Sequence, residues 1–186
     1  MKFKIEKILH FWFVETPDEK KFQKDLKFDQ VIKNRFLNDY ELARQNKLND
    51  WQETARGCLA LIILLDQFSR NLFRKSGKAF EQDEKSRSVL LKIITSNFLD
   101  KMSESERLFA LLPLIHSESI SDHEKAYELM EKYLKNHSDL EKIKKFWVDH
   151  TAVIKRFGRY PHRNEVLNRV SSDDEVKFLN TPNSSW

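Results

Sequence analysis

Residues that make tight turns are scarce in this sequence, which contains 3 glycines and 4 prolines among 186 residues. An all-β chain needs many such turns, so their scarcity argues against sandwiches and barrels and favours long helices joined by short loops. Hydrophobic residues make up 40% of the chain and charged residues 33%, which is not the composition of a disordered chain. The sequence therefore predicts an all-α globular protein.

Cysteine is nearly absent as well, because Cys58 is the only one and cannot form an internal disulfide. It begins the most apolar run of the chain, residues 58–65, so we expect a buried and unreactive thiol. That run is far too short to span a bilayer. The apolar stretch at residues 8–14 contains a histidine and lacks a small-residue cleavage site, so it does not resemble a signal peptide. We therefore expect a cytoplasmic protein without a membrane partner.

Neither sign of charge is in large excess, since 33 Lys and Arg residues face 29 Asp and Glu residues and the net charge is +4. The basic residues are interleaved with acidic ones, whereas a nucleic-acid-binding protein carries them in one stripe or patch. We expect no nucleic-acid partner. A chain of 186 residues fits one domain with one core. Residues 1–186 are therefore predicted to form a single helical domain that ends in a short polar tail, 181–186.

The segment from Cys58 to Arg74 is the stretch around which the chain is organised. Residues 58–65 are all apolar, so a helix here has no face to turn toward water, and we predict that it is the central, buried helix. A polar stripe follows at helical spacing, and its members are Asp66, Gln67, Arg70, Asn71 and Arg74. Guanidinium groups in such a stripe can hold a carboxylate or phosphate in a polar cleft. The alternative is an ordinary helical ion pair between Asp66 and Arg70.

Apolar residues recur at three- and four-residue spacing on both sides of this segment, which predicts a bundle of about eight helices. Three serine–glutamate pairs have the spacing of a capping box, namely Ser103 with Glu106, Ser121 with Glu124, and Ser172 with Glu175. Ser138 is expected to cap another helix, and Gly158 to end that helix in a left-handed conformation. Pro113 lacks a backbone donor, so it should kink or end the helix that contains it.

A second polar block, residues 156–165, has the sequence RFGRYPHRNE and should meet the polar stripe in space. Pro161 is predicted to begin a helix whose free amides, beside Arg159, His162 and Arg163, would form an anion site. The alternative is that the block only fixes the C-terminus on the core by pairing with acidic residues. The acids considered are Asp66, Glu118 and Glu165. The arginines of the two blocks outnumber these acids, so an excess of positive charge is expected where the blocks meet.

Three histidines are candidates for proton transfer. His150 lies on the apolar face of a long helix, where a neutral, hydrogen-bonded core residue is more common than a catalyst. His116 and Glu118 directly follow another apolar helix, and His162 lies in the C-terminal block. None of the spacings matches a metal-ligand signature, and no glycine-rich phosphate loop is present. We therefore predict no metal site and no cofactor.

Three segments carry a resemblance to a known family: residues 59–71 (LALIILLDQFSRN), 112–119 (LPLIHSES) and 156–169 (RFGRYPHRNEVLNR). With these segments the chain resembles the bacterial domain of unknown function 924 family over nearly its whole length. The resemblance implies an all-helical, TPR-like fold and no particular activity. Ser69, Ile115 and Asn168 stand where the family commonly has proline, methionine and glycine. Ser69 should leave the central helix straighter, and Asn168 should make the backbone after Leu167 less permissive.

The combined prediction is a single-domain, TPR-like helical bundle with a polar cleft that binds an anionic small molecule or a peptide carboxylate. The residues expected at this cleft are Asp66, Gln67, Arg70, Asn71, Arg74, His116, Glu118, His150, Arg156, Arg159, His162, Arg163 and Asn164. One alternative is a hydrolase or group-transfer enzyme whose catalytic candidates are His150, His116 and Asp66. The other is a TPR-like structural or protein-interaction module, in which these polar groups would saturate one another.

Overall fold

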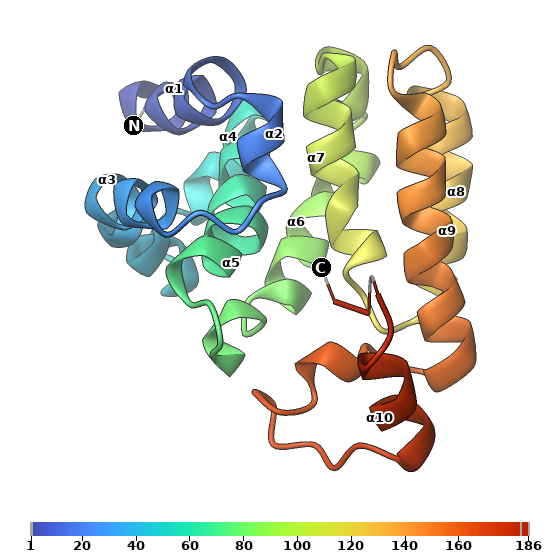
Figure 1. Ribbon diagram of the computed structural model, residues 1–186. Coiled ribbons are helices and arrows are strands. Elements are labelled where there is room, and N and C mark those ends of the chain that lie inside the picture. Colours follow the sequence, from blue (N-terminus) through green and yellow to red (C-terminus); the bar gives the residue numbers. More distant parts are fainter. Residues whose placement is uncertain (1, 183, 186) are drawn as a thin grey trace.

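The fold is taken from a computed structural model, which describes residues 2–182, 184 and 185 (Figure 1). The α-helices are α1 Lys2–His10, α2 Asp18–Lys21, α3 Leu26–Arg44, α4 Ala55–Ile62, α5 Ser69–Leu72, α6 Asp83–Thr95, α7 Glu104–Ile115, α8 Ile120–Tyr133, α9 Leu140–Phe157 and α10 Asp173–Leu179. No strand occurs within these described residues. The all-α prediction is therefore confirmed.

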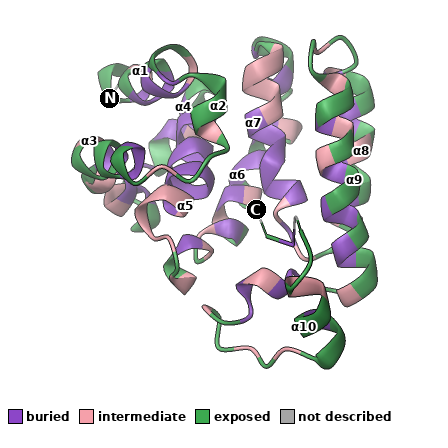
Figure 2. Ribbon diagram, in the orientation of Figure 1, coloured by how far each residue is buried: buried purple, intermediate pink, exposed green. Residues whose placement is uncertain are grey.

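The central helix consists of three consecutive segments, because α4 continues into a π-helix, Ile63–Phe68, and then into α5. Every residue from Gly57 to Ser69 is buried, and Figure 2 shows this segment at the centre of the molecule. The prediction of a buried central helix is confirmed, and Cys58 is buried with it. Ser69 does not interrupt the helix. That this serine leaves the central helix straighter stays a prediction. The residues directly before it form a π-helix, whose turns are wider than those of an α-helix.

The other helices surround this centre. α1, α6 and α7 contact α4, while α3 contacts the π-helix and α5. Figure 1 shows α7, α8 and α9 side by side, with α10 beyond the end of α9. One large cluster of buried hydrophobic residues extends from Ile5 to Trp147. The TPR-like arrangement and the single-domain organisation stay predictions. In the part of the chain that the structure describes, no helix is both long and apolar enough to cross a bilayer.

Several helices begin or end where the sequence predicts. The capping boxes that form are Ser103 with Glu106 and Ser172 with Glu175. Gly158 ends α9 with a φ angle of 68°, as predicted. Asn168 has a φ angle of 54°, in the left-handed region that glycine adopts most easily and asparagine next. The asparagine therefore keeps the backbone conformation for which glycine is the usual residue.

Two predicted caps are wrong, and Pro113 does not end its helix. Ser121 does not open α8, because the helix begins one residue earlier, at Ile120, with Ser119 as its N-cap. Ser138 does not cap α9, which begins directly after Asp139. Pro113 lies inside α7, which continues to Ile115. Proline removes one hydrogen bond there, but the residues around it are buried apolar side chains whose packing holds the turn together.

The capping results give a first prediction. Ser103→Ala should lower the free energy of unfolding by about 1 kcal/mol, because the hydroxyl oxygen accepts the Glu106 amide. Ser121→Ala is the matched control and should change it by less than about 0.5 kcal/mol, because that exposed serine caps no helix. Urea unfolding of both variants measures the difference. Equal losses for the two serines would contradict the assignment of the cap.

Candidate functional site

Asp66 and His116 form the centre of the site. Asp66 lies in the π-helix and has 0% of its side chain exposed, whereas His116, directly after α7, has 15% exposed. The Nδ1 atom of His116 is 2.7 Å from Oδ1 of Asp66. Within the described residues, no hydrogen bond uses Nε2 of His116. The pair therefore places a buried carboxylate on one side of the imidazole and leaves the other nitrogen available.

Neighbouring side chains stabilise the ionised form of Asp66. Burial alone would raise the pKa of Asp66, but the interactions with His116, Arg70 and Gln67 more than offset this, and the pKa lies below its usual value. Gln67 donates from Nε2 to Oδ2 at 2.5 Å, and Nη2 of Arg70 is 3.5 Å from Oδ1. Because an ionised carboxylate only accepts hydrogen bonds, Nδ1 of His116 must carry the proton that it shares with Asp66. Neutral His116 then has an unprotonated Nε2.

Two arginines share a second carboxylate beside this pair. Asp83, at the start of α6, accepts from Nη2 of Arg70 at 2.7 Å and from Nη1 of Arg163 at 3.0 Å. Arg163 also donates from Nη2 to the carbonyl oxygen of His116 at 2.9 Å. Both guanidinium groups lie over the ring of Phe80, at 4.5 Å and 4.4 Å from its centroid. The polar stripe and the C-terminal block therefore meet, as the sequence predicts.

The expected excess of positive charge does not occur, because each of these guanidinium groups has a carboxylate partner. Arg74 pairs with Asp29 on α3, and Arg159 donates to Glu175 on α10 at 2.6 Å and 2.7 Å. Asp29, Asp83 and Glu175 come from outside the two polar blocks, so the sequence count missed them. Asn71 donates to Asp29 as well, at 2.8 Å, and therefore lies on this outer pair, away from Asp66.

The prediction that Pro161 begins a helix with free amides for an anion is wrong. Pro161–Arg163 is a single 3₁₀ turn, and it offers no helix N-terminus for an anion. The block instead fixes the C-terminal segment on the core, as the alternative interpretation holds. Glu118 accepts from the Tyr160 amide at 2.8 Å and from Arg169 at 2.7 Å and 3.0 Å. Asn164 accepts from Nε of Arg169 at 2.9 Å, so Glu118 and Asn164 belong to this lock.

The two other predicted histidines, His150 and His162, have surroundings that disfavour proton transfer. His150 is 3% exposed and donates from Nδ1 to the carbonyl oxygen of Phe146 at 2.8 Å. Burial lowers the pKa of His150 to about 3, and burial together with the Arg163 charge lowers the pKa of His162 to about 3. Burial also lowers the pKa of His123, which the sequence analysis did not single out. His116 is therefore the histidine of this region that has a carboxylate partner.

Several predicted site residues lie elsewhere or serve other roles. Arg156 is exposed on α9 and makes no contact with the Asp66–His116 pair. Tyr160, which was not predicted, donates its hydroxyl to the carbonyl oxygen of Ile115, and burial raises its pKa. Asp83 and Phe80 carried no signal in the sequence that separates them from their neighbours. Among the described residues, no group of three or more potential ligands could hold a metal ion.

Comparison with known proteins gives two matches. The structure is similar to that of a protein of unknown function from Agrobacterium tumefaciens, with a TM-score of 0.86 and 32% sequence identity, over 96% of this chain and 98% of that chain. Among proteins with curated descriptions, none shows significant similarity. The model of the family described as bacterial protein of unknown function (DUF924) matches residues 8–183. Because this match covers nearly the whole sequence, the chain belongs to the DUF924 family.

Proposed function

We propose that this protein is a hydrolase in which His116 acts as general base and then as general acid, and Asp66 orients it. The observation that carries the proposal is the 2.7 Å contact between Nδ1 of His116 and the fully buried carboxylate of Asp66. A carboxylate at Nδ1 fixes the tautomer and the direction of the ring, and it stabilises the imidazolium that forms during proton transfer. The class of substrate is an acyl compound such as an ester.

The proposed step needs only water as a second reactant. Nε2 of His116 takes a proton from water while the water oxygen bonds to the acyl carbon. The bond from that carbon to the leaving oxygen then breaks, and the leaving oxygen receives the proton from Nε2. The products are a carboxylic acid and an alcohol.

Two other functions have less support. Anion binding at the arginines would have to displace carboxylates that already hold Arg70 and Arg163 through Asp83. A purely structural role accounts for Glu118 and Glu175, whose oxygens all accept hydrogen bonds, but it does not require a fully buried carboxylate beside the partly exposed ring of His116. We propose the cytoplasm as the place of action, because the buried free thiol of Cys58 fits a reducing compartment.

The test is hydrolysis of p-nitrophenyl esters with acyl chains of increasing length. We expect one or more of these esters to be hydrolysed, and His116→Gln to lower kcat/KM by about 10²–10⁴-fold. Asp66→Asn should lower it too and change the pH profile, because an amide can present its N–H to Nδ1 and favour the wrong tautomer. The matched control is His137→Gln, a partly exposed histidine between α8 and α9, which should keep full activity.

A second measurement needs no substrate. Nitrogen-15 NMR of the imidazole should show His116 protonated at Nδ1 in the wild type and at Nε2 in Asp66→Asn. Protonation at Nδ1 in the wild type would show that Asp66 fixes the tautomer of His116 that the proposal requires. Full activity of His116→Gln, or no hydrolysis of any ester by a protein with the expected tautomer, would overturn the assignment of a hydrolase.

A further inference from the structure

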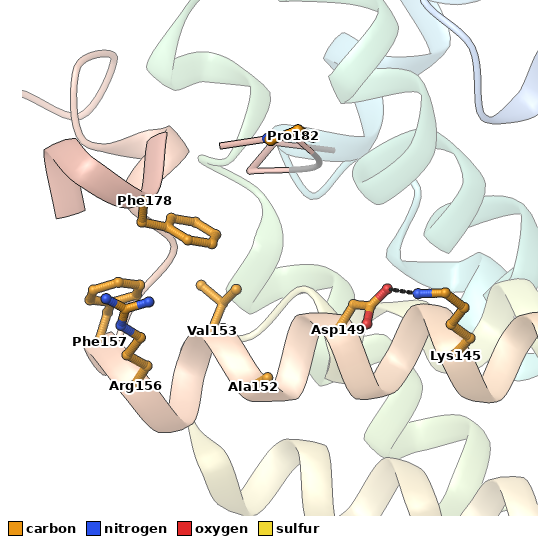
Figure 3. Close-up of a pocket in the computed structure, with 8 residues that line it drawn as sticks. All are labelled: Lys145, Asp149, Ala152, Val153, Arg156, Phe157, Phe178 and Pro182. Atoms are coloured by element: carbon orange, nitrogen blue, oxygen red, sulfur yellow. Dashed lines mark hydrogen bonds and ion pairs between the residues drawn. The ribbon is translucent and has the colours of Figure 1, made fainter. Parts of the chain in front are cut away.

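A hollow lies between the C-terminal half of α9 and the segment around α10, away from the Asp66–His116 pair. Its apolar wall consists of Val153 and Phe157 on α9 and Phe178 on α10 (Figure 3). Its volume is about 330 Å³, which is the size of a small ligand. Figure 3 shows the Phe178 ring directed toward Val153, with Arg156 and Phe157 at one end. We call this space the α9–α10 hollow.

Arg156 has an unusual environment for an arginine of this protein. Within the described residues, it donates to no carboxylate and to no carbonyl oxygen, and its guanidinium lies 4.6 Å from the centroid of the Phe157 ring. Every other arginine in that part of the chain has a carboxylate or a backbone carbonyl as partner. Stacking on an aromatic face orients the planar group and leaves its N–H edge available for a bidentate acceptor.

The charged side chains around the hollow leave a net charge of one sign. Lys145 and Asp149, at the end opposite Arg156, form an ion pair of 2.7 Å and neutralise each other (Figure 3). The hollow therefore carries one uncompensated positive charge, that of Arg156. A second hollow of about 340 Å³ adjoins the first and shares Arg156 and Phe157 with it. The guanidinium thus stands at the junction of two spaces.

We propose that the α9–α10 hollow binds a monocarboxylate with an apolar or aromatic body. Phe157, Phe178 and Val153 pack together into one apolar wall, with the two ring centroids 5.2 Å apart. The body lies against this wall, and the carboxylate accepts two hydrogen bonds from Arg156. A single negative charge matches the single unpaired guanidinium. This chemistry belongs both to a free aromatic acid and to the C-terminal residue of a peptide, whose preceding residue would extend into the second hollow. The site shares no residue with the proposed hydrolytic pair and is independent of it.

Isothermal titration with 3-phenylpropionate and with N-acetyl-alanyl-phenylalanine tests the proposal. We expect millimolar binding, at least about tenfold weaker for the corresponding amides and for Arg156→Gln, because both changes remove the charged pair. Acetate, which has no apolar body, should not bind measurably. Arg44→Gln is the matched control, an exposed arginine on α3 that pairs with Glu41, and it should bind both probes as the wild type does.

The ratio of the two probes' affinities shows whether the hollow binds a free acid or the C-terminal residue of a peptide. Binding of the dipeptide at least about tenfold more tightly than the free acid identifies a peptide terminus, and equal binding identifies a small acid. Phe178→Leu, which keeps an apolar side chain on α10, should weaken both probes while leaving the circular dichroism spectrum unchanged. No heat of binding for either probe up to about 10 mM, or equal affinity for acids and amides, would overturn the proposal.

Discussion

Replacing Asp83 by alanine is expected to lower the free energy of unfolding by roughly 3–5 kcal/mol, because one carboxylate serves two guanidinium groups. Arg163 is only 6% exposed, and Asp83 is its carboxylate partner, at 3.0 Å. Without Asp83, Arg163 keeps its bond to the carbonyl oxygen of His116 but stays a buried charge without a counter-ion. Arg70 loses the same partner. Urea unfolding of the wild type and of Asp83→Ala measures the change.

Two further variants separate the cost of the buried charge from a general weakening of the fold. Glu128→Ala removes an exposed partner of Lys125 and should cost at most about 1 kcal/mol. Asp83→Ala combined with Arg163→Met should lose less stability than Asp83→Ala alone, since the second change removes the uncompensated charge. A loss below about 1 kcal/mol for Asp83→Ala would mean that water reaches both guanidinium groups.

Asp83 also shows where sequence reasoning about the site stops. The sequence predicts that Arg70 and Arg163 need partners, because buried guanidinium groups are otherwise too costly. It does not say which acid they meet, because Glu81, Asp83 and Glu84 all lie within four residues. The structure shows that Asp83, the first residue of α6, is the one that faces both guanidinium groups. Glu175 was predicted as a capping residue, and the same carboxylate also holds Arg159. A pattern that reports one role for a residue does not exclude a second.

The fold was easier to predict than the site. Burial of residues 58–65 follows from a run with no polar face, and the end of α9 follows from a glycine at a position that needs a positive φ angle. The π-helix at Ile63–Phe68 has no such signature, because the same apolar residues suit an ordinary α-helix. It matters for the proposed function, since Asp66 lies within it. Its wider turns set the direction in which Asp66 meets His116.

The protein is expected to lose roughly 2–4 kcal/mol of stability between pH 7 and pH 5, and the cause is His150 with His162. Both have a pKa of about 3 in the folded state, against an ordinary value near 6.5 in an unfolded chain. The unfolded chain therefore binds protons that the folded chain does not, once the pH falls below about 6.5. The stabilisation is complete above that pH and is lost steadily toward pH 3.

The window from pH 7 to pH 5 isolates these histidines from the acidic residues. The carboxylates with lowered pKa values, such as Glu15 and Glu175 with values of about 2, lose their contribution only when the pH falls below the ordinary carboxylate range near 4.5. His150, at 3% exposure, accounts for roughly 2 kcal/mol. His162 is half-buried, so solvent reduces its share. His123, whose pKa burial also lowers, acts in the same direction.

Urea unfolding at pH 7, 6 and 5 tests this account. His150→Gln cannot bind the proton at position 150, so its stability should depend on pH less steeply than that of the wild type, even if the variant is less stable at every pH. His10→Gln is the matched control, because His10 is exposed and pairs with Glu15 at the surface, and its pH dependence should follow the wild type. The slope, rather than the absolute stability, decides the question, because it counts the protons taken up on unfolding. Equal stability at pH 7 and pH 5 would mean that the buried histidines take up protons in the folded state.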